Sequence, residues 1–213
     1  WSRDEQILNS CNDYGYDQLF ARQIEAHGQK RDMFIAISTS GNSKNLIEAL
    51  KVARKKDLIT VKALQLSVSN GRELSYNEWD GSYFHTTRVA ARKAYQEAGI
   101  TDPRKQVSMI EVHDCFSVTE LITMEDLFIS EEGRASHDIL DGFYDADGAL
   151  PCQIDGGLKC FGHPIGATGL RMLYEMYLQL NGRAGKRQIS DPVFGLTHNL
   201  GGFPSQNVSS VTI

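Results

Sequence analysis

The segment that most constrains the folding of this chain is residues 156–169, with the sequence GGLKCFGHPIGATG. Five of its fourteen residues are glycine, which lets the backbone turn sharply and approach a ligand closely. Pro164 directly follows His163 and restricts that histidine to extended or turn geometry. We therefore expect His163 on a loop ahead of a helix, where its imidazole is a candidate general base.

Bulk properties exclude several classes of protein. With 213 residues the chain has room for one large or two small domains, and its net charge of −5 gives no basic surface for nucleic acid. The sequence contains no apolar run long enough to span a bilayer, so we expect no membrane partner. Its irregularly spaced cysteines favour reduced thiols and a cytoplasmic protein. These cysteines are Cys11, Cys115, Cys152 and Cys160.

The first part of the chain follows a strand–turn–helix pattern. Residues 33–37 form an apolar run of strand length, and residues 45–56 carry apolar side chains at helical spacing. The turn between them is rich in hydroxyl groups, which can cradle a phosphate at the positive end of a helix. An ordinary helix cap explains the same residues equally well. The candidate phosphate ligands are Ser38, Thr39, Ser40 and Ser43.

Two motifs of this part resemble a sugar-isomerase domain of the phosphoheptose-isomerase type. They are NDYGYDQLFARQ at residues 12–23 and IAISTSGNS at residues 35–43. The resemblance implies that the hydroxyl-rich turn holds a sugar phosphate. The upstream glycine-rich loop, the catalytic glutamate and the late catalytic histidine of that family have no counterpart here. We therefore expect a sugar-isomerase-like fragment over residues 1–60, without isomerase activity of its own.

The remainder, residues 61–213, alternates strands and helices and is expected to form a layered α/β domain. Strands are predicted at 107–112, 193–197 and 208–213, the last two joined by a turn at Gly201-Gly202. Helices are predicted at 86–98, 116–128 and 167–180. Thr86 or Thr87 is expected to cap the first helix and Gly99 to end it. Residues 129–152 are expected to form a long surface excursion. The face that the third helix buries is expected to comprise Leu170, Leu173, Met176, Tyr177 and Leu180.

Three histidines fall at the ends of predicted strands or in the glycine loop: His113, His163 and His198. Side chains at strand ends commonly converge on one edge of an α/β sheet. His113 is placed to donate a hydrogen bond to a developing oxyanion, and His163 to act as general base. Cys115 is expected to exchange protons between its thiol and thiolate forms. Taken one by one, each of these residues is better explained by a structural role, and it is their occurrence together that favours a shared site. A metal site is a weaker alternative because closely spaced ligand pairs are missing.

Three ordered motifs resemble the C-terminal half of a thiolase, nearest to the sterol-carrier-protein type and its acetyl-CoA acetyltransferase relatives. They are HDCFS at 113–117, GLKCFGHPIGATG at 157–169 and HNLG at 198–201. The resemblance implies half of a five-layered α/β fold that acts on acyl-coenzyme A thioesters by Claisen condensation or its reverse. His163 then activates a nucleophilic cysteine, His113 completes an oxyanion hole and Cys115 is the acid/base. Substrate contacts are assigned to Gly162, Gly166, His198 and Asn199.

The family's acyl-accepting cysteine lies in the N-terminal half of a thiolase, and no cysteine of this chain has a matching context. Without that thiolate the covalent route has no first step. The expected function is thus an incomplete thiolase-type acyltransferase domain that takes coenzyme A as substrate, with no covalently bound cofactor and no metal. Two alternatives are a phosphosugar isomerase or binding module, and a non-catalytic subunit of a larger complex. We expect a homo-oligomer or a complementing subunit.

Overall fold

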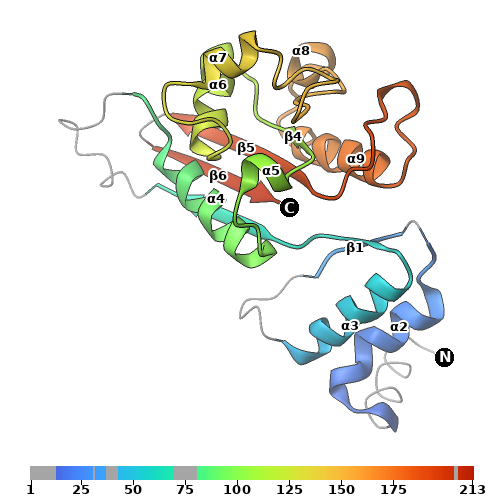
Figure 1. Cartoon of the computed structure of the whole chain (residues 1–213). Helices are drawn as coiled ribbons and strands as arrows, with labels where there is room; N and C mark the ends of the chain where they lie inside the picture. The colour runs from blue at the N-terminus through green and yellow to red at the C-terminus, as the bar shows by residue number, and fades with distance from the viewer. Residues whose placement is uncertain (1–12, 31, 37–42, 70–80, 204–205) are drawn as a thin grey trace. The chain divides into compact units, whose positions relative to one another are not determined.

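A computed structural model describes residues 13–30, 32–36, 43–69, 81–203 and 206–213 (Figure 1). The chain divides into two compact units, Trp1–Val61 and Lys62–Ile213. Both units mix helices and strands.

In the first unit, two helices pack against each other. The unit also contains two short strands that pair in parallel. The pair joins β1 to β2 in parallel, with Met33 opposite Ile59. Its small core includes Leu19, Ala21, Ala49 and Ala53. The predicted helix at 45–56 is confirmed as α3. The elements are η1 (Tyr16–Gln18), α2 (Leu19–His27), β1 (Met33–Phe34), α3 (Lys44–Lys55) and β2 (Ile59–Thr60).

The second unit is built on a four-stranded sheet with the order β3-β6-β5-β4. β6 pairs antiparallel with both β3 and β5, whereas β4 pairs parallel with β5. The strands are β3 (Leu64–Val68), β4 (Met109–Glu111), β5 (Gly195–Phe203) and β6 (Gln206–Thr212). The helices are α4 (His85–Ala98), α5 (Pro103–Gln106), α6 (Ser117–Asp126), α7 (Ala135–Leu140), α8 (Gly157–Phe161), α9 (Thr168–Leu180) and η2 (Gly185–Arg187).

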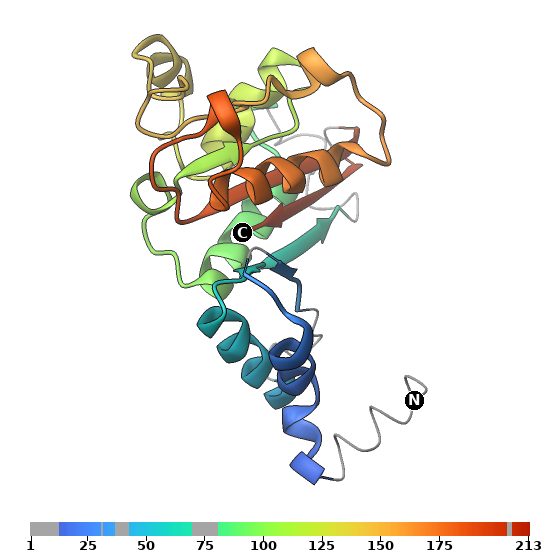
Figure 2. The same ribbon diagram turned by 90° about the vertical axis from the view of Figure 1, so that its right-hand side faces the viewer.

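Helices α4 and α9 lie on opposite faces of the sheet, as Figure 2 shows. On one face, the hydroxyl of Thr87 on α4 contacts the ring of His198 on β5. On the other face, α9 approaches β5 so closely that a Cβ on Gly195 would overlap the sulfur of Met176. The core lies mainly on the α4 side and includes Ile110, Leu127, Leu150, Leu196 and Val211, each at most 1% exposed.

The start of α4 differs from the prediction, and its end agrees with it. The N-cap is Phe84, so Thr86 and Thr87 are not caps but buried residues of the first turn. Their hydroxyls hydrogen-bond to residues of β5 and β6, which is a tertiary role that local sequence does not reveal. Gly99 adopts the predicted left-handed C-cap conformation, with a φ of 73°.

The predicted buried face of α9 is correct only in part, because Leu173, Tyr177 and Leu180 are half-buried. Met176 is buried, but Leu170 is 68% exposed. The buried side of the helix is mostly polar and consists of Thr168, Met172, Glu175, Met176 and Gln179. Glu175 and Gln179 are satisfied there, because Arg187 pairs with Glu175 and also accepts a bond from Gln179 through its carbonyl oxygen. Apolar spacing alone therefore indicated a side of α9 that this chain leaves partly open.

Two further expectations are corrected, and one strand was missed. Gly201 and Gly202 are not a turn; they lie within β5, opposite Val208 and Asn207 of β6. The excursion at 129–152 contains α7 and anchors itself in the core through buried Ile129, Ala135, Tyr144 and Leu150. Strand β3 was not predicted, although the alternation of Leu64, Leu66 and Val68 is a strand signal.

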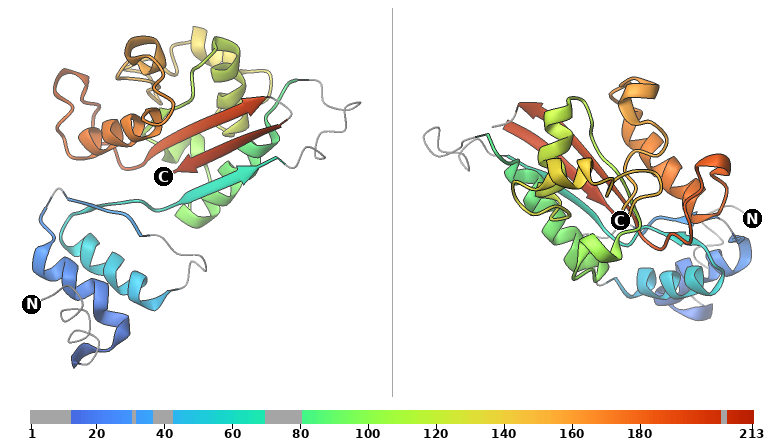
Figure 3. Two further views of the ribbon diagram at one scale, coloured as in Figure 1. Left: turned by 180° about the vertical axis from the view of Figure 1, so that it is seen from behind. Right: turned by 45° about the horizontal axis from the view of Figure 1, so that its top comes forward.

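Strand β3 presents an apolar strip to solvent. It forms the edge of the sheet next to β6, as Figure 3 shows from behind. Leu64, Leu66 and Val68 are 52%, 62% and 63% exposed, and they share one face because alternate residues of a strand point the same way. Hereafter this strip, Leu64, Leu66 and Val68, is called the open strip.

Candidate functional site

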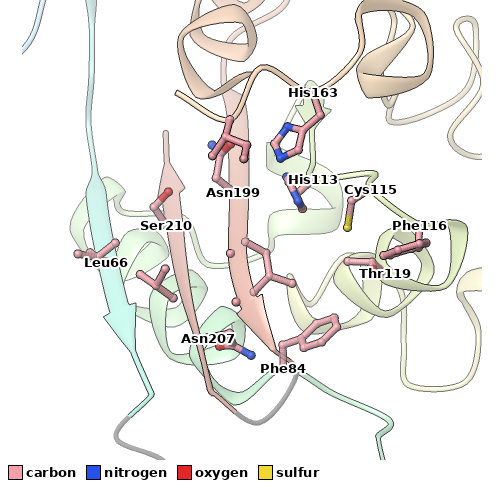
Figure 4. A pocket seen from close by; sticks show the side chains of 15 residues that line it. Leu66, Phe84, His113, Cys115, Phe116, Thr119, His163, Asn199, Asn207 and Ser210 are labelled. Atoms are coloured by element: carbon pink, nitrogen blue, oxygen red, sulfur yellow. The ribbon is translucent and has the colours of Figure 1, made fainter. Parts of the chain in front are cut away.

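A cavity of about 520 Å³ lies in the second unit where the loop after β4, the loop before α9 and strand β5 meet (Figure 4). All three motifs that the sequence singled out contribute side chains to it. The lining comprises Leu66, Phe84, His113, Cys115, Phe116, Thr119, His163, Ile165, Asn199, Leu200, Gly201, Gly202, Asn207, Val208 and Ser210.

His113 follows β4 and is 7% exposed, so its ring is largely removed from water. Burial lowers the pKa of His113, the nearby His163 lowers it further, and Asp114 opposes both effects. The two imidazoles contact edge to face, with ring centroids 4.9 Å apart. Because two positive rings at this distance repel each other, the pair favours a neutral His113 beside His163. A neutral imidazole can still donate one hydrogen bond into the cavity.

The loop that carries His163 begins with Gly162, whose φ of 73° is left-handed and is accessible mainly to glycine. Nδ1 of His163 lies 2.8 Å from Oγ1 of Thr168, the first residue of α9. Figure 4 shows the ring directed toward His113 and the cavity. The predicted loop ahead of a helix is therefore present, and its backbone aims the imidazole at the second histidine.

Asp114 fastens the two histidine-bearing loops together. Its carboxylate oxygens accept the N–H of Leu158, at 3.0 and 3.1 Å. Close by, Nε2 of Gln153 donates to the carbonyl oxygen of Val112 at 2.7 Å. Sequence reasoning gave Asp114 no role. Its position between His113 and Cys115 was the available sequence signal. The structure shows that Asp114 supports the segment that leads to His163.

Cys115 is exposed and lines the cavity, just before Phe116, the N-cap of α6. Its thiol is therefore open to a ligand. The other described cysteines differ from it. Burial raises the pKa of the Cys152 thiol well above its usual value, and Glu120 and Glu111 add to this effect. Cys160 is exposed on α8, outside the cavity lining.

The two polar residues of the HNLG motif point to opposite faces of β5. Asn199 lines the cavity. His198 is fully buried on the α4 side, where its Nε2 lies 3.0 Å from Oγ1 of Thr87. From there a chain of hydroxyl contacts continues through Ser209 to Thr86 and ends at Asn207. Burial lowers the pKa of His198 to about 3, so this ring is neutral. His198, predicted to contact substrate, is therefore buried away from the cavity, whereas Asn199 lines the cavity.

The remaining predicted ligands lie elsewhere. Gly162 and Gly166 are exposed in the loop around His163, and neither is part of the cavity lining. Ser38, Thr39 and Ser40 fall outside the described residues. Ser43 takes the N-cap position of α3, with its carbonyl oxygen accepting the N–H groups of Leu46 and Ile47.

Several lining residues were not anticipated from the sequence. Leu66 belongs to the unpredicted strand β3, and Ser210 lies opposite both Leu66 and Asn199 on β6. Phe84 and Thr119 contribute from the starts of α4 and α6. The sheet register brings Leu66 and Ser210 together, and the packing of α4 and α6 adds Phe84 and Thr119; none of this is visible in the sequence, because these residues are far apart in the chain.

Across the described ranges, no three His, Cys, Asp or Glu side chains converge as metal ligands do. None of the helices in the described part of the chain is both long and apolar enough to cross a membrane. Chemically, the cavity offers a buried hydrogen-bond donor, a second imidazole that can take up a proton, an accessible thiol and an amide. Those groups suit proton transfer next to a carbonyl whose oxygen gains negative charge.

Comparison with known families separates the chain into two parts. Residues 67–213 match the model of the thiolase C-terminal domain-like family. Residues 1–64 match the model of the SIS domain family. Both resemblances inferred from the motifs are thereby confirmed.

Individual relatives agree with this division. The chain is similar to the acetyl-CoA acetyltransferase of Methanothermobacter thermautotrophicus, with 43% identity over 134 residues, which are 63% of this chain and 34% of the relative. It is also similar to human sterol carrier protein 2, with 42% identity over 118 residues, 55% of this chain and 21% of the relative. Near the N-terminus it is similar to phosphoheptose isomerase 2 of Campylobacter jejuni, with 54% identity over 59 residues, 27% of this chain and 29% of the relative.

The chain spans about a third or less of the length of each of these relatives. Among solved structures it resembles the Ltp2-ChsH2(DUF35) aldolase, with a TM-score of 0.56 and 20% identity over 70% of this chain and 38% of the other. At that identity the likeness concerns the fold alone. Motifs, cavity and family model agree, and through residues 67–213 the chain belongs to the thiolase C-terminal domain-like family.

Proposed function

We propose that residues 62–213 supply part of a thiolase-type acyltransferase site, which acts on acyl-coenzyme A thioesters and needs a nucleophilic cysteine from outside this sequence. The observation that carries the proposal is the convergence of His113, Cys115, His163 and Asn199 in one cavity. These residues come from three separate motifs, and two of them are imidazoles in edge contact.

Each group has a task in this reaction class. His113, neutral and buried, donates a hydrogen bond to the thioester oxygen as negative charge develops there. Cys115, exposed at the cavity, removes or returns a proton at the carbon next to the carbonyl. His163 accepts the proton of the incoming nucleophilic thiol. Asn199 completes the polar side of the cavity, and the apolar side chains Leu66, Phe84 and Val208 provide the remaining surface.

Proton exchange tests this assignment without the missing nucleophile. The chain is incubated with acetyl-coenzyme A in deuterium oxide, and exchange of the methyl protons is followed by NMR. We expect exchange above the buffer rate and a loss of at least about tenfold in Cys115→Ser, because a general acid/base group contributes about 10²- to 10⁴-fold. Cys160→Ser, which changes an exposed cysteine outside the cavity, is the matched control.

Two results would contradict the proposal. Exchange at the buffer rate in the presence of saturating acetyl-coenzyme A would remove the acid/base role of Cys115. Thiolysis of a 3-ketoacyl-coenzyme A by the chain alone, abolished in His163→Ala, would show that the chain carries its own nucleophile. The expected result is no measurable thiolysis.

A second candidate function is phosphosugar binding by the first unit. It is favoured by the SIS domain match over residues 1–64 and by the position of Ser43 at the N-terminus of α3. Calorimetry with sedoheptulose 7-phosphate tests it: binding that is lost in Ser40→Ala supports the function, and a flat titration rejects it. Isomerase turnover is not expected, because the catalytic glutamate and histidine of that family have no counterpart.

The third candidate is a non-catalytic subunit of a larger complex, or a homo-oligomer. The open strip, and separately the exposed Leu170 and Tyr174 of α9, favour a protein partner, because apolar side chains gathered on the surface of a folded unit often mark an interface. Sedimentation velocity over a range of concentrations separates the cases. Self-association supports the oligomer, whereas a monomer that gains thiolysis only with a cysteine-bearing subunit supports a complementing role.

A further inference from the structure

The hydroxyl of Thr168 has two neighbours. Nδ1 of His163 lies 2.8 Å from Oγ1, and the carbonyl oxygen of Pro164 lies 3.3 Å from the same atom. Thr168 is the first residue of α9 and is 2% exposed, so water does not compete for its hydroxyl. The contact to Pro164 is the bond that serine and threonine in helices often make to the carbonyl four residues earlier.

These two contacts favour one position for the proton of the His163 ring. A carbonyl oxygen only accepts, so in its contact with Pro164 the hydroxyl of Thr168 donates its single hydrogen to that oxygen, which also accepts the N–H groups of Ala167 and Thr168. With the hydrogen there, the hydroxyl oxygen is the acceptor for the histidine, and Nδ1 of His163 carries hydrogen. In a neutral imidazole the other nitrogen, Nε2, is left with a free lone pair.

The opposite edge of the ring faces the site. Thr168, which holds Nδ1, is not part of the cavity lining, whereas the imidazole of His163 is. Figure 4 shows that ring directed toward His113. Nε2 is therefore the nitrogen available to a thiol in the cavity.

We propose that Thr168 is a positioning residue that fixes neutral His163 as the Nδ1–H tautomer, so that Nε2 is the proton acceptor of the site. The catalytic role of this tautomer rests on the function proposed above, whereas the tautomer itself does not. In the step it serves, the S–H bond of a thiol breaks, its proton goes to Nε2, and a thiolate and an imidazolium result. The bond from Nδ1–H to Thr168 is present before and after this transfer, so the ring need not turn.

The tautomer is read directly from the nitrogen chemical shifts of the histidine side chains. The probe is the uniformly ¹⁵N-labelled chain near pH 8, and the signals of His163 are identified by their absence in His163→Gln. We expect a protonated Nδ1 and an unprotonated Nε2. In Thr168→Val, which keeps the shape of the side chain but removes the hydroxyl, we expect the population to shift toward Nε2–H. Thr168→Ser, which restores a hydroxyl, should restore the original pattern.

Thr123→Val is the matched control, because Thr123 is another fully buried threonine whose hydroxyl makes no hydrogen bond within the described residues. It should leave the His163 signals unchanged. A predominant Nε2–H form in the unaltered chain overturns the proposal, as does a pattern that Thr168→Val does not change. If Thr168→Val fails to fold, Thr168→Ala, which also removes the hydroxyl, makes the same test. Because the readout needs no acyl-coenzyme A, it is independent of the exchange experiment.

Discussion

Gly157 occupies the point at which the loops of His113 and His163 meet. Its φ of 59° is left-handed, and a Cβ there would overlap the carboxylate of Asp114 and lie 2.9 Å from Nε2 of Gln153. Both neighbours are engaged, since Asp114 accepts from Leu158 and Gln153 donates to Val112. A side chain at this position would therefore meet both backbone strain and two neighbours that their own hydrogen bonds hold in place.

We accordingly expect Gly157→Ala to lower the free energy of unfolding by about 1–3 kcal/mol, the usual range for strained backbone. Urea denaturation followed by circular dichroism measures it. Gly166→Ala is the control, because its φ is not left-handed and a Cβ there meets no atom within 4 Å. Equal stability of the two variants would show that the contact between the loops is not tight in solution.

His198 makes the chain sensitive to acid. Its pKa is lowered to about 3 by burial, whereas an unfolded histidine titrates near 6.5. Between these values only the unfolded state binds the proton, so the free energy of unfolding falls as pH falls from about 6.5 toward 3. From pH 6.5 to pH 5 this amounts to at most about 2 kcal/mol.

The test compares urea denaturation at pH 7.5 and pH 5. His198→Gln should lose less stability on acidification than the unaltered chain, because glutamine does not titrate. His137→Gln changes an exposed histidine of α7 and should behave like the unaltered chain. The same acid response in all three proteins would be evidence against a neutral buried His198.

At the scale of elements, one partly buried arginine joins α9 to the sheet. Nη1 of Arg171 lies 3.2 Å from Oε2 of Glu111 on β4 and also pairs with Asp155. The carboxylates are 1% and 3% exposed. Burial raises the pKa of Glu111 to about 9, the charge of Asp155 adds to this, and Arg171 opposes it. One cation thus stabilises two buried acids.

Removing that cation in Arg171→Met should cost about 3–5 kcal/mol at pH 8, because breaking a buried pair leaves uncompensated charge. Because burial already raises the pKa of Glu111 to about 9, that carboxyl group keeps its proton in the folded state at pH 8 and at pH 5, and we expect a similar loss at both. Denaturation at both pH values measures the loss. Arg183→Met, at an exposed position just after α9, should cost little at either pH.

The elements also show what the sequence could predict. The motifs placed His113, Cys115 and His163 correctly on loops, because glycine, proline and strand periodicity are local signals. The strand predicted to end at Thr197 continues to Phe203, so Asn199 lies inside β5 and not at its end. The side to which His198 points was not predictable, since a shift of one residue in the register of β5 reverses every side chain. For α9, apolar spacing indicated the buried face only in part, because buried Glu175 and Gln179 are satisfied by Arg187, which follows the helix.

At the scale of the whole molecule, the two units differ in the amount of core they bury. The described buried apolar side chains of the first unit are few and mostly alanine, namely Leu19, Ala21, Ala49 and Ala53. The second unit has a core with larger residues on several elements, such as Ile110, Leu127 and Leu196. A small unit with little buried apolar surface is marginally stable.

Hydrogen exchange should therefore distinguish the units. We expect amides of α2 and α3 to exchange faster than those of α4, β5 and β6, because their local unfolding costs less free energy. Mass spectrometry of peptic peptides at constant pH measures the rates. Equal protection of α3 and α4 would indicate that both units unfold together.

The open strip has a consequence for the life of the protein in a cell. Leu64, Leu66 and Val68 lie on an edge strand, where unpaired backbone groups and apolar side chains offer a template for another strand. We therefore expect a chain whose edge stays uncovered to be held by chaperones or cleared by quality-control proteases until a partner shields that edge. Leu66→Lys, which places a charge on this edge, should lengthen the cellular half-life measured by pulse-chase labelling.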